Sequence, residues 1–197
     1  MNTPNKLTIG RIIATPVFMA TMLINFKYHY TVSLVIFVLA SFTDMLDGKI
    51  ARKYNLITDF GKFLDPLADK MLTTAAYLGF IYMYRGNIRC CIIVSAVTFI
   101  VLFREFMVSS IRLVTVSSGG KVIAANIWGK AKTMSQMVGI SAALFYYTLK
   151  EFVEISGSVN KTIDAVIMGL FILSGVLCVI SGGIYLAGSK DYINPSK

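Results

Sequence analysis

The most informative stretch of this sequence for predicting its structure and function is DMLDGKIARKYNLITDFGKFLDPLAD, residues 44–69. Four of its aspartates form two pairs: Asp44 and Asp47 are spaced i,i+3, and Asp65 and Asp69 are spaced i,i+4, so each pair lies on one face of a predicted helix. The chain has only ten acidic residues among 197, and 56% of it is hydrophobic. Grouped carboxylates in apolar surroundings are costly unless they are paired or hold a metal. The spacing therefore predicts a divalent cation between the two pairs.

Small residues accompany both pairs. Gly48 and Ala51 fall on the same side of their helix as the first pair, and Gly61 lies one turn before the second. A missing or minimal side chain lets a ligand or a neighbouring helix approach closely. Oxygen ligands with no histidine or cysteine nearby suit Mg²⁺ or Mn²⁺ rather than Zn²⁺.

The complete spacing is D-x2-D-G-x2-A-R-x8-G-x3-D-x3-D, and it resembles the signature of the CDP-alcohol phosphotransferase family. The segments 4–8, 61–70, 104–112 and 129–133 are similar to the bacterial phosphatidylglycerophosphate synthase branch of that family. This resemblance implies transfer of a phosphatidyl group from CDP-diacylglycerol to glycerol 3-phosphate, with release of CMP. It also implies a homodimer.

The resemblance assigns roles to the motif. It implies two Mg²⁺ or Mn²⁺ ions, with Asp69 acting in addition as the general base that takes the proton of the acceptor hydroxyl. Thr58, one of the CDP-lipid contacts given next, could cap the following helix instead of binding the lipid, or could do both. For Asn5 and Thr8, helix capping is an equal alternative to lipid contact. The implied metal ligands are Asp44, Asp47, Asp65 and Asp69, and the implied contacts to the CDP-lipid are Asn5, Thr8, Gly48, Ala51, Arg52, Thr58 and Gly61.

Four cations follow the motif and predict an acceptor site. Arg104 and Arg112 are separated by about 80° around a helix and can converge on one pocket, whereas Lys130 and Lys132 differ by about 200°, so at most one of them faces it. A cluster of fixed cations suits an acceptor that carries its own phosphate. Anchoring at the inner leaflet is the alternative, and Glu105 could neutralise the arginine beside it.

The composition indicates an integral membrane protein with one domain, residues 1–197. Its mean hydropathy is +0.70 and only 15% of its residues are charged. The chain therefore has more apolar surface than a soluble domain of this size needs. The formal net charge of +9 does not indicate nucleic-acid binding, because the basic residues form no patch with interleaved aromatic residues. Membrane topology and anionic ligands account for it better.

Hydropathy predicts an all-α fold with a short interfacial helix at 2–9 and six transmembrane helices. With this arrangement 14 of the 19 lysines and arginines fall on the side of the aspartate pairs and both termini. The positive-inside rule then places that side in the cytoplasm, in a multi-pass protein of the cell membrane. The expected spans are 12–24, 31–53, 59–84, 92–116, 124–149 and 163–186, with a polar loop at 150–161.

Two alternatives remain at this point. One keeps the same chemistry with another acceptor, such as an inositol phosphate. The other belongs to a different class, an ion-coupled transporter in which membrane carboxylates form an ion pathway. A transporter does not need Gly48, Ala51, Arg52 and Gly61 at these spacings.

Overall fold

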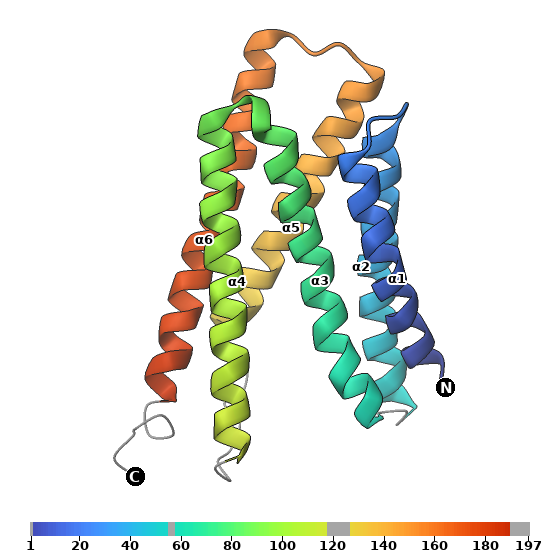
Figure 1. Cartoon of the computed structure of the whole chain (residues 1–197), viewed down its shortest axis with the longest axis vertical. Coiled ribbons are helices and arrows are strands. Elements are labelled where there is room, and N and C mark those ends of the chain that lie inside the picture. Colours follow the sequence, from blue (N-terminus) through green and yellow to red (C-terminus); the bar gives the residue numbers. More distant parts are fainter. Residues whose placement is uncertain (1, 55–57, 118–126, 190–197) are drawn as a thin grey trace.

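The computed structural model describes residues 2–54, 58–117 and 127–189. Within these ranges all regular structure is helical, as the sequence predicts (Figure 1). A single 3₁₀ turn, η1, links the third and fourth helices at Tyr84–Gly86. The six helices are α1 (Thr3–Leu23), α2 (His29–Lys53), α3 (Asp59–Met83), α4 (Ile88–Ser117), α5 (Ile127–Phe152) and α6 (Gly157–Gly188).

Two predicted boundaries are wrong. The separate interfacial helix at 2–9 does not exist, because α1 runs without a break from Thr3 to Leu23. Pro4 stands in its first turn, where a missing N–H costs nothing, and Asn2 caps it by accepting from the N–H of Asn5. The polar loop at 150–161 is also shorter than expected, because α5 and α6 continue as helices into their polar ends.

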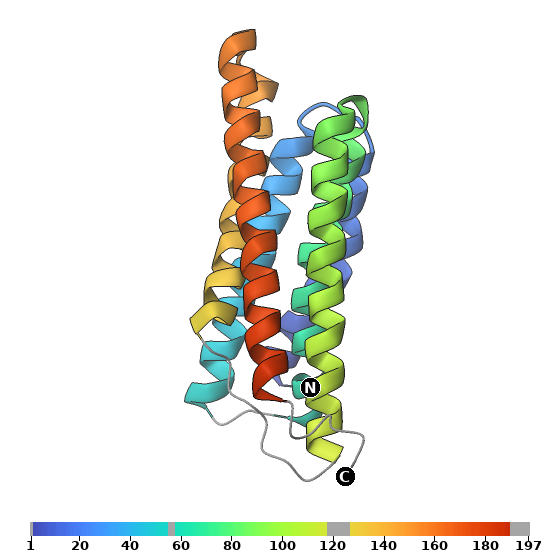
Figure 2. The ribbon, with the colours of Figure 1, turned by 90° about the vertical axis from the view of Figure 1, so that its left-hand side faces the viewer.

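By their most extensive packing the six helices form two groups of three, and Figures 1 and 2 show the bundle from two directions. In the first group α1 lies between α2 and α3 and packs along both, while α2 and α3 contact each other far less. In the second group α6 packs on α4 and α5, and α5 runs obliquely across the bundle to reach α2. The end of α2 and the start of α3 therefore lie at one end of the bundle, beside the start of α1.

Aromatic side chains join the two groups in the core. The rings of Tyr77 and Phe80 on α3 meet Phe171 on α6, with centroids 5.5 and 5.2 Å apart. The Tyr77 hydroxyl also forms a hydrogen bond of 2.9 Å with the hydroxyl of Ser174, so a buried polar group is satisfied across the interface. Gly139 on α5 leaves room for the same Phe171 ring, since an added Cβ would lie 3.3 Å from it.

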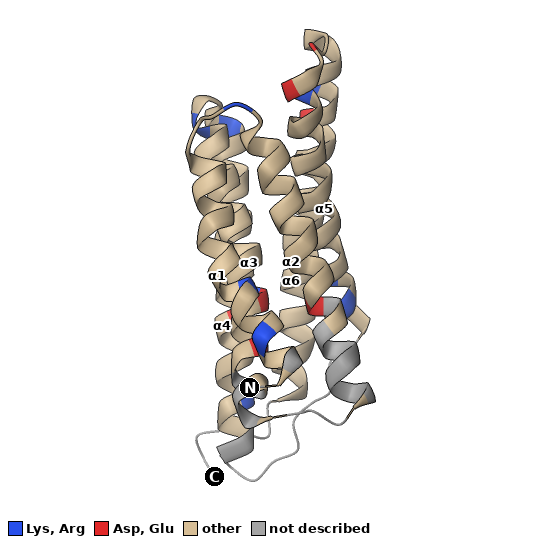
Figure 3. Ribbon diagram, turned by 90° about the vertical axis from the view of Figure 1, so that its right-hand side faces the viewer, with Lys and Arg blue, Asp and Glu red and all other residues tan. Residues whose placement is uncertain are grey.

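The outer surface of the bundle is apolar over its middle. Large side chains such as Phe99 on α4 and Val179 on α6 are 69% and 60% exposed. Figure 3 shows an uncharged stretch between the described charged residues at one end and those in the half of the bundle that holds the N-terminus. An extended apolar exterior of this kind fits a lipid surround rather than water. The described helices that are long and apolar enough to cross a membrane are Pro4–Leu23, Ile88–Thr115 and Gly157–Gly188.

At the end of the bundle opposite the motif, one carboxylate links two helices by hydrogen bonds. Glu151 on α5 accepts hydrogen bonds from the backbone N–H groups of Tyr30 and Thr31 at 2.7 and 3.0 Å, and from the Thr31 hydroxyl at 2.6 Å. These are the N–H groups that a helix leaves without partners in its first turn. Glu151 thus caps α2 and ties it to α5.

Candidate active site

Side chains of α1 form hydrogen bonds with one aspartate of each pair. Arg11 is almost fully buried, and its guanidinium Nη1 donates to Oδ1 of Asp44 on α2 at 2.5 Å. Three residues earlier, the hydroxyl of Thr8 donates to Oδ1 of Asp65 on α3 at 2.7 Å. One face of α1 therefore holds one carboxylate from each pair.

The same helix also fixes the start of α3. The hydroxyl of Thr58 accepts from the N–H of Gly61 at 3.0 Å, which confirms the predicted N-cap, and the Asn5 amide Nδ2 donates to that hydroxyl at 3.0 Å. A Cβ on Gly61 would lie 2.9 Å from Oδ1 of Asn5, closer than real contacts allow. The lack of a side chain at Gly61 therefore allows the Asn5 side chain of α1 to lie close to the backbone of α3.

Part of the motif is placed only by its backbone. Asp47, Gly48, Ala51 and Arg52 belong to the last turns of α2, and their side chains lie outside what the structure describes. Their roles in binding metal and CDP-lipid stay predictions.

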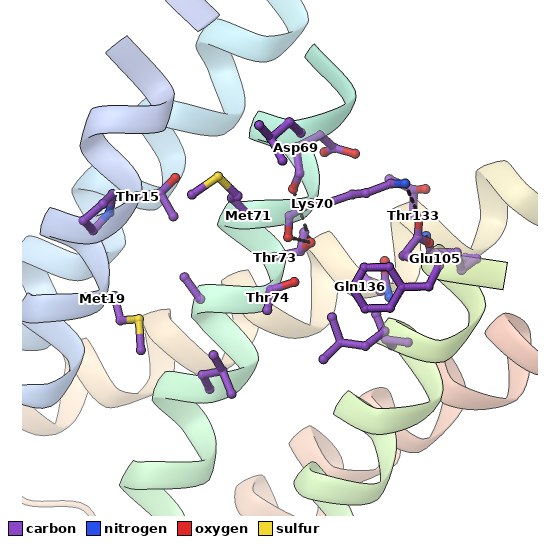
Figure 4. A pocket seen from close by; sticks show the side chains of 18 residues that line it. Thr15, Met19, Asp69, Lys70, Met71, Thr73, Thr74, Glu105, Thr133 and Gln136 are labelled. Carbon is purple, nitrogen blue, oxygen red and sulfur yellow. Dashed lines mark hydrogen bonds and ion pairs between the residues drawn. The ribbon is translucent and has the colours of Figure 1, made fainter. Parts of the chain in front are cut away.

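A cavity of about 410 Å³ opens beside the second aspartate pair (Figure 4). Asp69 and Lys70 line it from α3, Glu105 from α4 and Lys132 from α5. Asp69 is exposed and lies within electrostatic range of Asp44, so one carboxylate of each pair lies at this end of the bundle. The rest of the lining is mostly apolar and comes from α1, α3, α4 and α5: Thr15, Pro16, Met19, Leu67, Met71, Thr73, Thr74, Ala75, Leu78, Val101, Leu102, Phe106, Thr133 and Gln136.

Three cations surround the carboxylate of Glu105. Lys132, which is 7% exposed, forms an ion pair with Oε1 and also donates a hydrogen bond to it. Arg104 approaches the same oxygen at 3.1 Å, and its Nε donates to the Ser181 hydroxyl on α6. Lys70 lies 3.6 Å from Oε2, and Figure 4 shows its side chain extending toward Glu105. Glu105 neutralises part of this charge, as its sequence position allowed.

The four predicted acceptor cations are not equivalent in the structure. Lys132 lines the cavity, and Arg104 reaches it indirectly through their shared partner Glu105. Arg112 and Lys130 have exposed side chains and are not among the residues that line this cavity. Lys130 and Lys132 thus differ in their access to this cavity, and the expectation that at most one of them faces the acceptor stays a prediction.

Sequence reasoning missed two residues of the site, Arg11 and Lys70. Arg11 had a signal, because it follows Thr8 by three residues and so shares its helix face. Lys70 had a weaker one, its position directly after Asp69. Neither contact partner could be identified, since each lies on another helix.

The described carboxylates suit a hard divalent cation in their chemistry. Asp44, Asp65 and Asp69 are exposed and offer only oxygen ligands, and two of them are oriented by hydrogen bonds from α1. Among the side chains that the structure describes, no three acidic, histidine or cysteine groups gather closely enough to hold an ion unaided. Asp47 lies outside that set.

Fold and site together define an all-helical membrane protein with an acidic site at one end of the bundle. Its sequence matches the pattern of the CDP-alcohol phosphatidyltransferase family over residues 1–180. The chain belongs to this family, as the motif led us to expect.

Three relatives carry the same name, CDP-diacylglycerol–glycerol-3-phosphate 3-phosphatidyltransferase. The protein from Bacillus subtilis is 38% identical in an alignment 157 residues long, and the match covers 74% of this chain and 77% of the relative. The protein from Rickettsia bellii is 35% identical over 97% of both chains. The protein from Salmonella paratyphi A is 33% identical over 96% of this chain and 95% of its own length. The similarity therefore extends well beyond the motif.

Proposed function

We propose that this protein transfers the phosphatidyl group of CDP-diacylglycerol to sn-glycerol 3-phosphate, giving phosphatidylglycerophosphate and CMP. The observation that carries the proposal is similarity over nearly the whole chain to relatives with that name, combined with a motif filled at every position. Family membership does not favour the transporter. Another phosphorylated acceptor, such as an inositol phosphate, is the outcome that an acceptor panel would reveal.

Asp44, Asp47, Asp65 and Asp69 would hold Mg²⁺ or Mn²⁺, with two ions per site as the expectation. Bound there, the metal would polarise the pyrophosphate of the donor and offset the charge that develops on the departing CMP. Asn5, Thr8, Gly48, Ala51, Arg52, Thr58 and Gly61 remain the proposed surroundings of the CDP moiety, with Arg52 suited to phosphate oxygens by its planar guanidinium.

Asp69 is the proposed general base. Its carboxylate lines the cavity and is exposed, so an acceptor hydroxyl placed there could pass its proton directly to Asp69. The resulting alkoxide oxygen would attack the β-phosphorus, and the bond from that phosphorus to the CMP oxygen would break.

The charge beside Asp69 supports an acceptor with a phosphate of its own. With the negative charge of Asp69 assigned to the proposed metal, Lys70, Arg104 and Lys132 carry three positive charges against the one negative charge of Glu105, an excess of two (3 − 1). A phosphate monoester carries roughly −1.5 to −2 near neutral pH and would balance that excess. Serine, which is a zwitterion, and free inositol would bring no net charge to balance it. We propose Lys132 as the principal ligand of the acceptor phosphate, with Arg104 beside it.

The membrane arrangement follows from the same reading. We propose one domain of six transmembrane helices, with α2, α3 and α5 crossing the membrane alongside the three more apolar helices. The proposal places the motif and both termini on the cytoplasmic side, because 14 of the 19 basic residues fall there. The expected assembly is a homodimer. Crosslinking in membranes tests the assembly, and cysteine labelling from each side tests the orientation.

An acceptor panel tests the reaction itself. Purified protein in detergent is supplied with CDP-diacylglycerol, Mg²⁺ and one acceptor at a time, and CMP is measured. The proposal expects CMP with glycerol 3-phosphate and not with serine, free inositol or glycerol. Equal or higher turnover with inositol phosphate would reassign the acceptor while leaving the chemistry intact.

A further inference from the structure

We infer that α1 acts as a positioning helix for the metal site, through Thr8 on Asp65 and Arg11 on Asp44. This inference rests on the proposed function, since it assumes that the two aspartate pairs hold a shared divalent cation. It gives Arg11 a task, and it gives Thr8 a second one beside its proposed place in the surroundings of the CDP moiety.

The packing of the bundle creates the need for such a helix. The two aspartate pairs lie on α2 and α3, and these helices contact each other little, whereas α1 packs along both of them (Figure 1). A shared ion requires its carboxylates at fixed separation, with ligand distances defined to a few tenths of an ångström. The separation of the two pairs is therefore set through α1.

The contacts are suited to orienting ligands rather than to replacing the ion. Each hydrogen bond uses Oδ1 of its carboxylate, and a carboxylate has a second oxygen with which to bind a cation. Thr8 and Arg11 are both buried, at 0% and 2% exposure, so their side chains are held in place by the surrounding packing. The Thr8 hydroxyl also lies 3.1 Å from the Pro4 carbonyl, the longer of its two contacts. Groups that hold metal ligands in this way alter metal affinity or activity about 10- to 100-fold when removed.

Thr8 gives the sharper test, because Thr8→Val removes a hydroxyl without changing any charge or much volume. Arg11→Met removes both the hydrogen bond and a positive charge close to the cation. If the arginine merely competed with the ion for Asp44, Arg11→Met would tighten Mg²⁺ binding, which is opposite in sign to the effect of lost positioning. Thr8→Ser keeps the hydroxyl and is the conservative rescue.

The matched control lies at the other end of the same pair of helices. Ser33 is buried on α2, and its hydroxyl is 2.8 Å from that of Thr21 on α1. Ser33→Ala therefore removes a polar contact between α1 and α2 far from the aspartates. It is expected to lower thermal stability without changing the affinity for Mg²⁺.

The experiment titrates Mg²⁺ alone into the purified full-length protein by isothermal titration calorimetry, with no substrate present. We expect Thr8→Val and Arg11→Met each to raise the Kd for Mg²⁺ about 10- to 100-fold, with Thr8→Ser and Ser33→Ala close to wild type. In turnover assays the Mg²⁺ concentration for half-maximal rate should rise by a similar factor, while kcat at saturating Mg²⁺ largely recovers.

The outcomes separate the two proposals. A wild-type protein that binds no Mg²⁺ would overturn the metal site of the proposed function and the positioning role with it. A wild-type protein that binds Mg²⁺, together with Thr8→Val that binds it equally well, would overturn the positioning role alone. Tighter binding by Arg11→Met would overturn that role for Arg11.

Discussion

Replacing Lys132 by methionine tests the acceptor site most sharply, because this lysine is buried and lines the same cavity as Asp69. A charge-assisted hydrogen bond to phosphate contributes about 1.5–3 kcal/mol. Its loss should lower kcat/KM for glycerol 3-phosphate by roughly 10- to 150-fold, at tenfold per 1.4 kcal/mol. The KM for CDP-diacylglycerol should change little, since the proposed donor contacts lie on α1, α2 and the start of α3.

The assay measures CMP release while each substrate is titrated separately, after a thermal melt has shown that the variant is folded. Lys130→Met is the matched comparison: it removes the same charge two residues away on a side chain that is exposed and does not line the cavity. If the two variants lose the same activity, the effect is one of general charge at the membrane surface. If the loss with Lys132→Met falls on the donor, this lysine belongs to the CDP site and our reasoning about the acceptor is refuted.

Three further changes have defined expectations. Asp69→Asn should lower kcat by about 10²- to 10⁴-fold while sparing binding of the CDP-lipid, and near-normal turnover would remove Asp69 from the role of base. Gly61→Ala should melt at a lower temperature than Gly169→Ala, because a Cβ at position 61 would displace the Asn5 amide that donates to Thr58, whereas position 169 has open space; equal melting temperatures would contradict this. Glu151→Ala should cost about 1–3 kcal/mol by uncapping α2, as measured by denaturant unfolding, and an unchanged midpoint would show that the cap is dispensable.

The local pattern of the sequence predicts the helices well and their partners poorly. The range predicted for the second span, 31–53, falls within two residues of His29–Lys53, and the third, 59–84, ends one residue beyond Asp59–Met83. These boundaries are local, since they depend on apolar runs and on the cap at Thr58. The break expected after residue 9 is absent from the structure. Gly10 and Arg11 continue α1, because neither residue prevents a helix from continuing.

The contacts of the site are long-range and could not be read from spacing. Asp44 and Arg11 are 33 residues apart, and Lys132 and Glu105 are 27 apart, so each pair depends on which helices become neighbours. The packing of α1 between α2 and α3 decides the first of these pairs. The motif predicts that the carboxylates share a site, but not that another helix orients them.

The central claim is tested most directly by one reconstitution. Purified protein is mixed with CDP-diacylglycerol, glycerol 3-phosphate and Mg²⁺, and both CMP and the lipid product are quantified, with each component omitted in turn. The account predicts equal amounts of CMP and phosphatidylglycerophosphate, and no product when the donor, the acceptor or the divalent cation is left out. Full turnover in the presence of a chelator, or CMP release that does not depend on glycerol 3-phosphate, would contradict it.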